Sequence, residues 1–311
     1  MGIREELVER SGNEEMLFAD GYDDAINELT KTAKRQDKQA AKLTRVKRNQ
    51  LILEQRAAKR TIRSLKKAQQ KLIDRLRYDL QNSSPEMLRS LATNRDLMTD
   101  YLLKNGFGDA TADWIQSQQE MLSGVFEGVQ SIDPLFNTNQ IDPRSFQTLQ
   151  LENTQAVFDD LILADTTKAL RTALTTIDVV DDTTSVLSAL ANTMQKSTGR
   201  QLTEVKTKIS EFGRASNAIA AKEAGLDQYL YTGPLDGLTR GFCFHLVNKV
   251  VNSSQMRKLN NNQIGNPLVS GGGYNCRHSW SPVSKGYVEA ADLELATDQD
   301  IRDANRAAKG G

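Results

Sequence analysis

The sequence is poor in the residue types on which disulfide scaffolds, large cores and membrane spans depend. Only 2 cysteines and 2 histidines occur among 311 residues, and aromatic residues make up 6%. Two cysteines are too few for a disulfide scaffold, and the low aromatic content indicates a modest core with much solvent-facing helix. No apolar run approaches the ~18 residues that a membrane span needs. The charged segment 1–10 lacks the apolar stretch of a signal peptide. We therefore expect no membrane segment and assembly in a cytoplasm.

Catalytic signature motifs are also missing. The sequence contains no Walker A loop, no G-x-G-x-x-G opening a helix, no H-E-x-x-H and no G-x-S-x-G. These absences leave no recognised motif for nucleotide, zinc-protease or serine-hydrolase chemistry, and we expect that the protein is not an enzyme.

Glycine and proline are absent from residues 22–81, where Ala, Lys, Arg, Gln and Leu dominate. These are strong helix formers, and they predict one long, coiled-coil-like helix over residues 22–82. A helix of ~60 residues would be ~90 Å long. Because no domain core is that wide, we expect part of this helix to pack on a partner or on a second copy of the chain.

The zero net charge conceals a strong segregation. Residues 31–77 hold 17 Lys and Arg against 3 Asp and Glu, a balance of +14, so the rest of the chain carries −14. Such a basic helix attracts polyanions or an acidic protein surface. No aromatic residue lies between positions 25 and 77, which disfavours base stacking. The candidate contacts to double-stranded DNA or an acidic partner are Lys34, Arg35, Arg45, Lys47, Arg48, Lys59, Arg60, Arg63, Lys66 and Lys67.

The remaining pattern predicts a mainly α protein with a small C-terminal α+β module. We expect a flexible acidic lead-in at 1–21, the basic helix at 22–82 and a helical bundle at 83–226, since apolar residues recur there at helical spacing. From about residue 227 the sequence becomes rich in turns, and the module is expected over 227–288. Residues 289–311 are expected to be a tail in which a helix frays into disorder, so that the tail is partly disordered.

All the cysteines and histidines of the chain lie in this module as two matching pairs, Cys243-x-His245 and Cys276-x-His278. One interpretation is a structural zinc site with two Cys and two His ligands. Because residues i and i+2 point ~200° apart on a helix, such pairs can share a metal only on strands or loops. The alternatives are a Cys243–Cys276 disulfide and plain burial of the cysteines as small hydrophobic residues.

A catalytic interpretation of the same residues is the alternative from a different class. His245 and His278 could act as an acid–base pair for RNA cleavage, with Lys249 or Arg277 stabilising charge on the phosphorane. The protein would then be an effector with a nuclease-like C-terminal domain.

Three ordered segments of the module hold Gly-Pro-Leu-Asp over residues 233–236, Thr-Arg-Gly-Phe-Cys over 239–243 and Tyr-Asn-Cys-Arg-His over 274–278. Together they resemble the C-terminal signature of the phage Mu F-type head-morphogenesis proteins. The first is Tyr-Leu-Tyr-Thr-Gly-Pro-Leu-Asp over residues 229–236, and the second is Thr-Arg-Gly-Phe-Cys over 239–243. The third is Gly-Gly-Gly-Tyr-Asn-Cys-Arg-His-Ser-Trp-Ser-Pro-Val over 271–283. Gly241 stands where that family commonly has proline, and the spacer 250–265 is rich in Asn and Ser rather than in charged residues.

The resemblance implies a minor capsid protein, present in few copies at the portal vertex of the virion head and made in the host cytoplasm. Its implied partners are the portal protein, other head proteins, viral DNA and further copies of itself. Its implied role is head assembly and genome packaging or ejection. The positions that match the family's pattern are Asp236, Thr239, Arg240, Cys243, Asn275, Cys276, Arg277 and His278. Physically, we expect Asp236 to pair with Arg240, and Asn275 to stabilise a tight loop.

Overall fold

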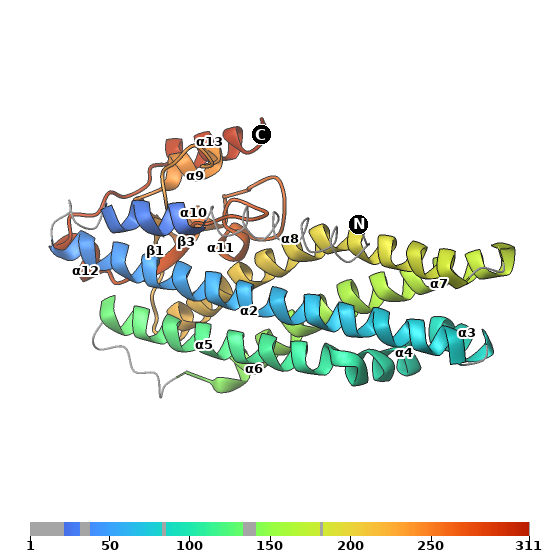
Figure 1. The fold of residues 1–311 in the computed structure, drawn as a ribbon. Coiled ribbons are helices and arrows are strands. Elements are labelled where there is room, and N and C mark those ends of the chain that lie inside the picture. The colour runs from blue at the N-terminus through green and yellow to red at the C-terminus, as the bar shows by residue number, and fades with distance from the viewer. Residues whose placement is uncertain (1–21, 32–37, 83–84, 133–140, 181–182, 311) are drawn as a thin grey trace. The chain divides into compact units, whose positions relative to one another are not determined.

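The computed structural model describes residues 22–31, 38–82, 85–132, 141–180 and 183–310. These residues form a mainly helical protein with one small antiparallel sheet near the C-terminus (Figure 1). The expected fold class is therefore confirmed. Within the described residues, no helix combines the length and the apolar character needed to cross a membrane.

The chain folds into two compact units, each assembled from separate segments. One unit comprises the residues up to Arg56, Gln118–Leu149 and the residues from Ile209 onward. The other comprises Ala57–Ser117 and Gln150–Lys208. These units differ from the consecutive domains expected from the sequence, because the long helices pass from one unit into the other. We call them the C-terminal unit and the helical unit.

A helix at residues 22–31 precedes the longest element, α2. The helices that follow are largely continuous, with short π-helical turns at η1 and η3. In chain order they are α2 (Lys38–Asn82), α3 (Pro85–Thr93), α4 (Arg95–Leu102), η1 (Leu103–Phe107), α5 (Gly108–Ile132), α6 (Pro143–Val157), η3 (Phe158–Leu163), α7 (Ala164–Val180) and α8 (Thr183–Glu223).

The apolar stripe of α2 is buried within the chain itself. In the C-terminal unit, Leu43 and Leu51 are buried, and in the helical unit the same holds for Ile62, Leu65 and Leu72. At 45 residues, α2 is ~68 Å long, shorter than the expected helix, and residues 32–37 lie outside the described residues. Since its own chain covers this stripe, the length of α2 does not by itself require a partner.

Two helix boundaries have identifiable local causes. The helix is broken at Gly106-Phe107-Gly108, because Gly106 has φ +107 and Asn105 also departs from helical angles. A φ of that sign is accessible to glycine at little cost. Upstream, the side chain of Asn94 accepts hydrogen bonds from the amides of Asp96 and Leu97 and so caps α4.

The C-terminal module is built on a three-stranded antiparallel sheet with the strand order β2-β1-β3. Its elements are β1 (Gln228–Thr232), α9 (Gly241–Leu246), β2 (Val250–Asn252), α10 (Ser253–Met256), α11 (Pro267–Ser270), β3 (Ser279–Val283), α12 (Lys285–Ala290) and α13 (Asp298–Ala307). In the register of the sheet, Tyr231 faces Trp280 and Tyr229 faces Pro282. The proline is tolerated because β3 is an edge strand.

Both faces of the sheet are buried. On one face Tyr229, Tyr231 and Trp280 join a core cluster with residues of α9 and α13. On the other face, Leu230, Val250 and Val283 pack with Leu43 of α2, as the two-residue alternation of strands requires. The N-terminal part of α2 is therefore part of the core of the module that carries the sequence signature.

The end of the chain differs from the expected tail. Residues 298–307 form α13, which lies beside α9 (Figure 1). Ile301 and Ala304 are buried in the core cluster around Trp280, and Thr297 and Asp300 form a capping box at the start of the helix. A helix was expected in this tail, but its packing was not, and the module extends beyond residue 288 through α13.

Candidate metal centre

Three rare side chains meet at one buried point of the C-terminal unit. Cys243 lies on α9, while Cys276 and His278 lie in the segment that leads into β3. Their candidate ligand atoms all lie within 4.8 Å of one another, and all three residues are buried. Two thiol sulfurs and an imidazole nitrogen are ligands that zinc prefers. We call these residues the Cys2His group, and this group could hold a metal ion.

The tautomer of His278 leaves a free lone pair within this group. The Nε2 atom lies 2.9 Å from the carbonyl oxygen of Pro234. Because a carbonyl can only accept, Nε2 must donate its proton there. In its neutral form the ring then presents an unprotonated Nδ1, and this atom lies 3.9 Å from the sulfur of Cys276. Metal-binding histidines commonly donate their second N–H to a backbone carbonyl in this way.

The glycine-rich segment allows the backbone to approach the sulfurs. The amide of Gly272 donates to the sulfur of Cys276 over 3.1 Å. A Cβ atom at position 272 would come within 2.4 Å of the sulfur of Cys243, so only glycine fits without a shift. The three-glycine segment 271–273 is therefore part of the wall of the Cys2His group.

The two cysteines are free, and their sulfurs lie 3.8 Å apart. The hydrogen bond with Cys243, aided by the charge of Arg214, holds the pKa of Cys276 well below its ordinary value. The same hydrogen bond, together with burial, raises the pKa of Cys243. This arrangement favours one thiolate and one thiol, and thiolate is the form that binds metals.

A buried arginine fixes the backbone around the group. Arg214, on α8, is 2% exposed. It donates to the carbonyl of Val269 and, over 3.2 Å each, to the carbonyls of Cys276 and His278. Its sequence position gave no signal, because a single cation within a helical pattern resembles any surface residue.

Ion pairing within the signature differs from the expectation. Asp236 accepts two hydrogen bonds of 2.6 Å from the guanidinium of Arg277, not from Arg240. Arg240 instead donates to the carbonyls of Gly272 and Tyr274. Sequence proximity favoured the wrong arginine. The Arg277 pair also holds the pKa of Asp236 below its ordinary value.

Two further signature residues stabilise turns. The hydroxyl of Thr239 donates to the carbonyl of Pro234 and accepts from the amide of Asp236, each over 3.0 Å. Asn275 has φ +53, a left-handed conformation that asparagine tolerates better than most residues. The expectation that Asn275 lies in a tight loop agrees with this geometry.

His245 does not belong to the Cys2His group, so the expected four-residue ligand set is not assembled. Cys243 and His245 both lie on helix α9, where residues two apart point in nearly opposite directions. The ring of His245 instead packs edge-on against Phe244, whose side chain is exposed. The other pair, Cys276 and His278, converges because that segment is not helical.

The basic residues predicted to contact DNA or an acidic partner differ in how exposed their side chains are. Lys34 and Arg35 lie outside the described residues. The prediction that Lys47 contacts DNA or an acidic partner is wrong. Lys47 is 1% exposed and donates to the hydroxyl of Ser279 over 2.7 Å. Burial lowers its pKa, and it cannot contact DNA in this conformation. Arg48 is half-buried and donates to the hydroxyl of Thr30.

The other basic residues of α2 remain accessible to a partner. Arg45 is exposed in the C-terminal unit, and Arg63 and Lys67 are exposed in the helical unit. Three more, Lys59, Arg60 and Lys66, are half-buried in the helical unit. Lys59, Arg63 and Lys67 follow one another at four-residue spacing, which places them along one face of the helix.

The fold and the site together define a mainly helical protein with a small α+β module built around a buried Cys2His group. Comparison with known proteins adds no relative, because no family model, no curated protein and no solved structure matches the chain.

Proposed function

We propose that the protein is a minor head protein of a tailed phage, located at the portal vertex and acting in head assembly and in genome packaging or ejection. The observation that supports this is the convergence of the three signature segments. Arg277 of the third segment binds Asp236 of the first, and Arg240 of the second binds the glycine-rich part of the third. Such mutual contacts are expected where a motif is the framework of one folded module.

The face of α2 that carries Lys59, Arg63 and Lys67, here called the basic face, is the proposed binding surface for viral DNA or an acidic surface of the portal. Its exposed cations supply attraction without base recognition, because phosphate contacts do not read sequence. Binding to DNA should therefore be independent of sequence and should weaken steeply with salt.

A direct test combines a gel shift with double-stranded DNA and a pull-down with a candidate portal protein from the genome that encodes this chain. We expect binding to at least one of them at low salt, with loss of DNA binding as the salt concentration rises. Absence of binding to both at low salt would contradict the proposed role of α2.

We further propose that the Cys2His group holds zinc in a structural role. A bound zinc ion would connect α9 to the segment before β3, and a small module gains folding free energy from such a connection. Metal analysis of the purified full chain should find one zinc per chain. His278→Gln should lose the metal, while the matched control His245→Gln should retain it. Loss in both variants, or no metal in the native chain, would contradict this assignment.

The geometry gives less support to the alternative function, a phage-carried effector with a nuclease-like C-terminal domain, than to the head protein. In this conformation His278 is 3% exposed and its Nε2 is bonded to the Pro234 carbonyl, so it does not face a substrate. Incubation of RNA with the full chain tests this alternative, and cleavage that His278→Ala abolishes would favour it over the head protein.

A further inference from the structure

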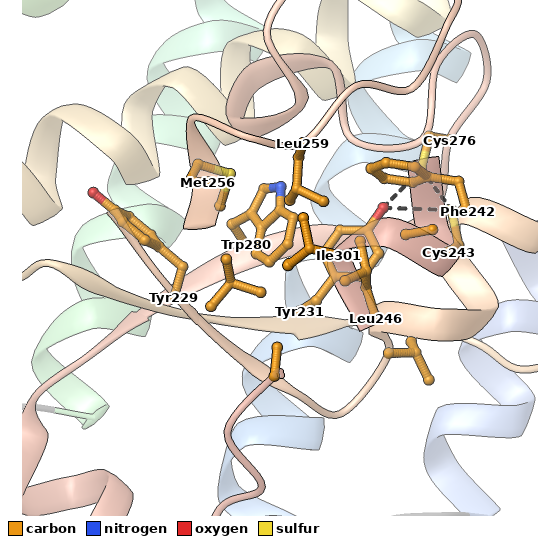
Figure 2. Close-up of a cluster of buried hydrophobic side chains, with 14 of the residues drawn as sticks. Tyr229, Tyr231, Phe242, Cys243, Leu246, Met256, Leu259, Cys276, Trp280 and Ile301 are labelled. Carbon is orange, nitrogen blue, oxygen red and sulfur yellow. Dashed lines mark hydrogen bonds between the residues drawn. The ribbon is translucent and has the colours of Figure 1, made fainter. Parts of the chain in front are cut away.

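We infer that the phenolic oxygen of Tyr231 is the fourth ligand of the metal ion proposed for the Cys2His group. This inference rests on the proposed metal site and specifies how its coordination is completed. Tyr231 lies on β1, and Figure 2 shows its hydroxyl directed at the two sulfurs.

The distances among the Tyr231 oxygen and the two sulfurs fit a tetrahedral ion. The Tyr231 oxygen lies 3.4 Å from the sulfur of Cys243 and 3.6 Å from that of Cys276. The two sulfurs are 3.8 Å apart. For zinc with bonds of ~2.3 Å to sulfur and ~2.0 Å to oxygen, a regular tetrahedron has edges of ~3.8 Å between sulfurs and ~3.5 Å between sulfur and oxygen. The three atoms thus already outline one face of such a coordination sphere.

No competing protein ligand is at hand in the part of the chain that the structure describes. Among the described Cys, His, Asp and Glu side chains, only Cys243, Cys276 and His278 come close enough together here to share a metal ion. Tyr231 is 0% exposed and its ring is in contact with Trp280, at 4.1 Å between centroids. It is also stacked on the His278 ring at 5.4 Å. The phenol therefore occupies the position that a coordinating water would need.

The surroundings also provide compensating charge. A divalent ion with two thiolates is neutral, and coordination by Tyr231 adds one negative charge as the phenol releases its proton to solvent. The guanidinium of Arg214 donates to the backbone carbonyls of two of the ligand residues. This buried positive charge stabilises an anionic ligand set.

With four protein ligands the metal ion has no open coordination position, and this indicates a structural role. Structural zinc sites use four protein ligands, whereas catalytic sites keep one position open for water or substrate. A tyrosine in the fourth position therefore makes the ion a structural connection between β1, α9 and the segment before β3, with no position for a reacting water.

Titration of the metal-free full chain with Co²⁺ tests the inference. We expect the absorption bands of tetrahedral cobalt thiolate together with the red-shifted ultraviolet absorption of tyrosinate. Tyr231→Phe should lose the tyrosinate signal, alter the cobalt bands and bind about tenfold or more weakly. Tyr229→Phe, on the same strand and in the same core cluster, should behave like the native chain.

The outcomes separate the inference from the metal site itself. Cobalt thiolate bands without tyrosinate absorption in the native chain would overturn the tyrosine ligand and leave the Cys2His site standing. Unchanged bands and affinity in Tyr231→Phe would do the same. Absence of any cobalt thiolate band in the native chain would overturn both. If Tyr231→Phe does not fold, the tyrosinate signal of the native chain decides alone.

Discussion

At the scale of single residues, the sequence predicted which rare side chains matter but not which of them meet. Both Cys-x-His pairs looked equivalent, and the ~200° divergence of positions i and i+2 on a helix already indicated that a helical pair would fail. Cys243 and His245 lie on α9, so His245 points elsewhere, while Cys276 and His278 lie in a non-helical segment. Tyr231 and Arg214 were missed, because an aromatic strand residue and a helical arginine carry no metal-site signal of their own.

The ion pair between Asp236 and Arg277 gives a prediction about pH. Asp236→Asn should lower the free energy of unfolding at neutral pH by about 1–3 kcal/mol, because the pair is charge-assisted, bidentate and partly buried. The pKa of Asp236 is lowered in the folded state from its ordinary value of 3.8. The native chain therefore has the full stabilisation from this pair at pH above that value. This stabilisation is lost as the pH falls through the lower, folded-state pKa.

Denaturant unfolding of the native chain and of Asp236→Asn across acidic pH measures this difference. Asp142→Asn is the matched control, since Asp142 also pairs with an arginine, Arg144, whose side chain is 85% exposed. The control should change stability little at any pH. A difference for Asp236→Asn that stays constant down to the most acidic pH would exclude the pair as its cause.

At the scale of elements, helix existence was predictable and helix packing was not. The absence of Gly and Pro from residues 22–81 predicted a long helix over residues 22–82, and α2 lies within that range. Periodicity does not say what covers an apolar stripe, so α2 was expected to need a partner although Leu43 packs under the sheet of its own chain. The burial of Lys47 has the same cause, since its partner Ser279 lies 232 positions away.

Helix α13 supplies an element-scale prediction. Ile301→Ala should reduce the free energy of unfolding by about 2–5 kcal/mol, because it removes a fully buried side chain from the module core. Arg302→Ala, on the exposed side of the same helix, should stay within about 0.5 kcal/mol of the native value. Chemical denaturation followed by circular dichroism measures both. Equal, small effects of the two changes would show that α13 is not part of the folded core.

At the scale of the whole molecule, charge segregation is the feature that the sequence predicted and the structure refined. Combined replacement of Lys59, Arg63 and Lys67 by Gln should weaken DNA binding. The slope of the log binding constant against the log salt concentration should also become shallower by about 2–3. Each lost phosphate contact removes about 0.9 from the magnitude of this slope. Replacement of the exposed Lys104, Lys168 and Lys285, which lie outside α2, is the control and should leave the slope unchanged. Equal effects of the two triple variants would mean that binding follows net charge and not the face of α2.

The central claim is that this chain is a minor component of a phage head. It is tested most directly by purifying particles from cells that carry its coding sequence, measuring its copy number by mass spectrometry and locating it by cryo-electron microscopy. The account predicts a few copies per particle with density at the portal vertex. Particles that package DNA and contain none of this chain would contradict it.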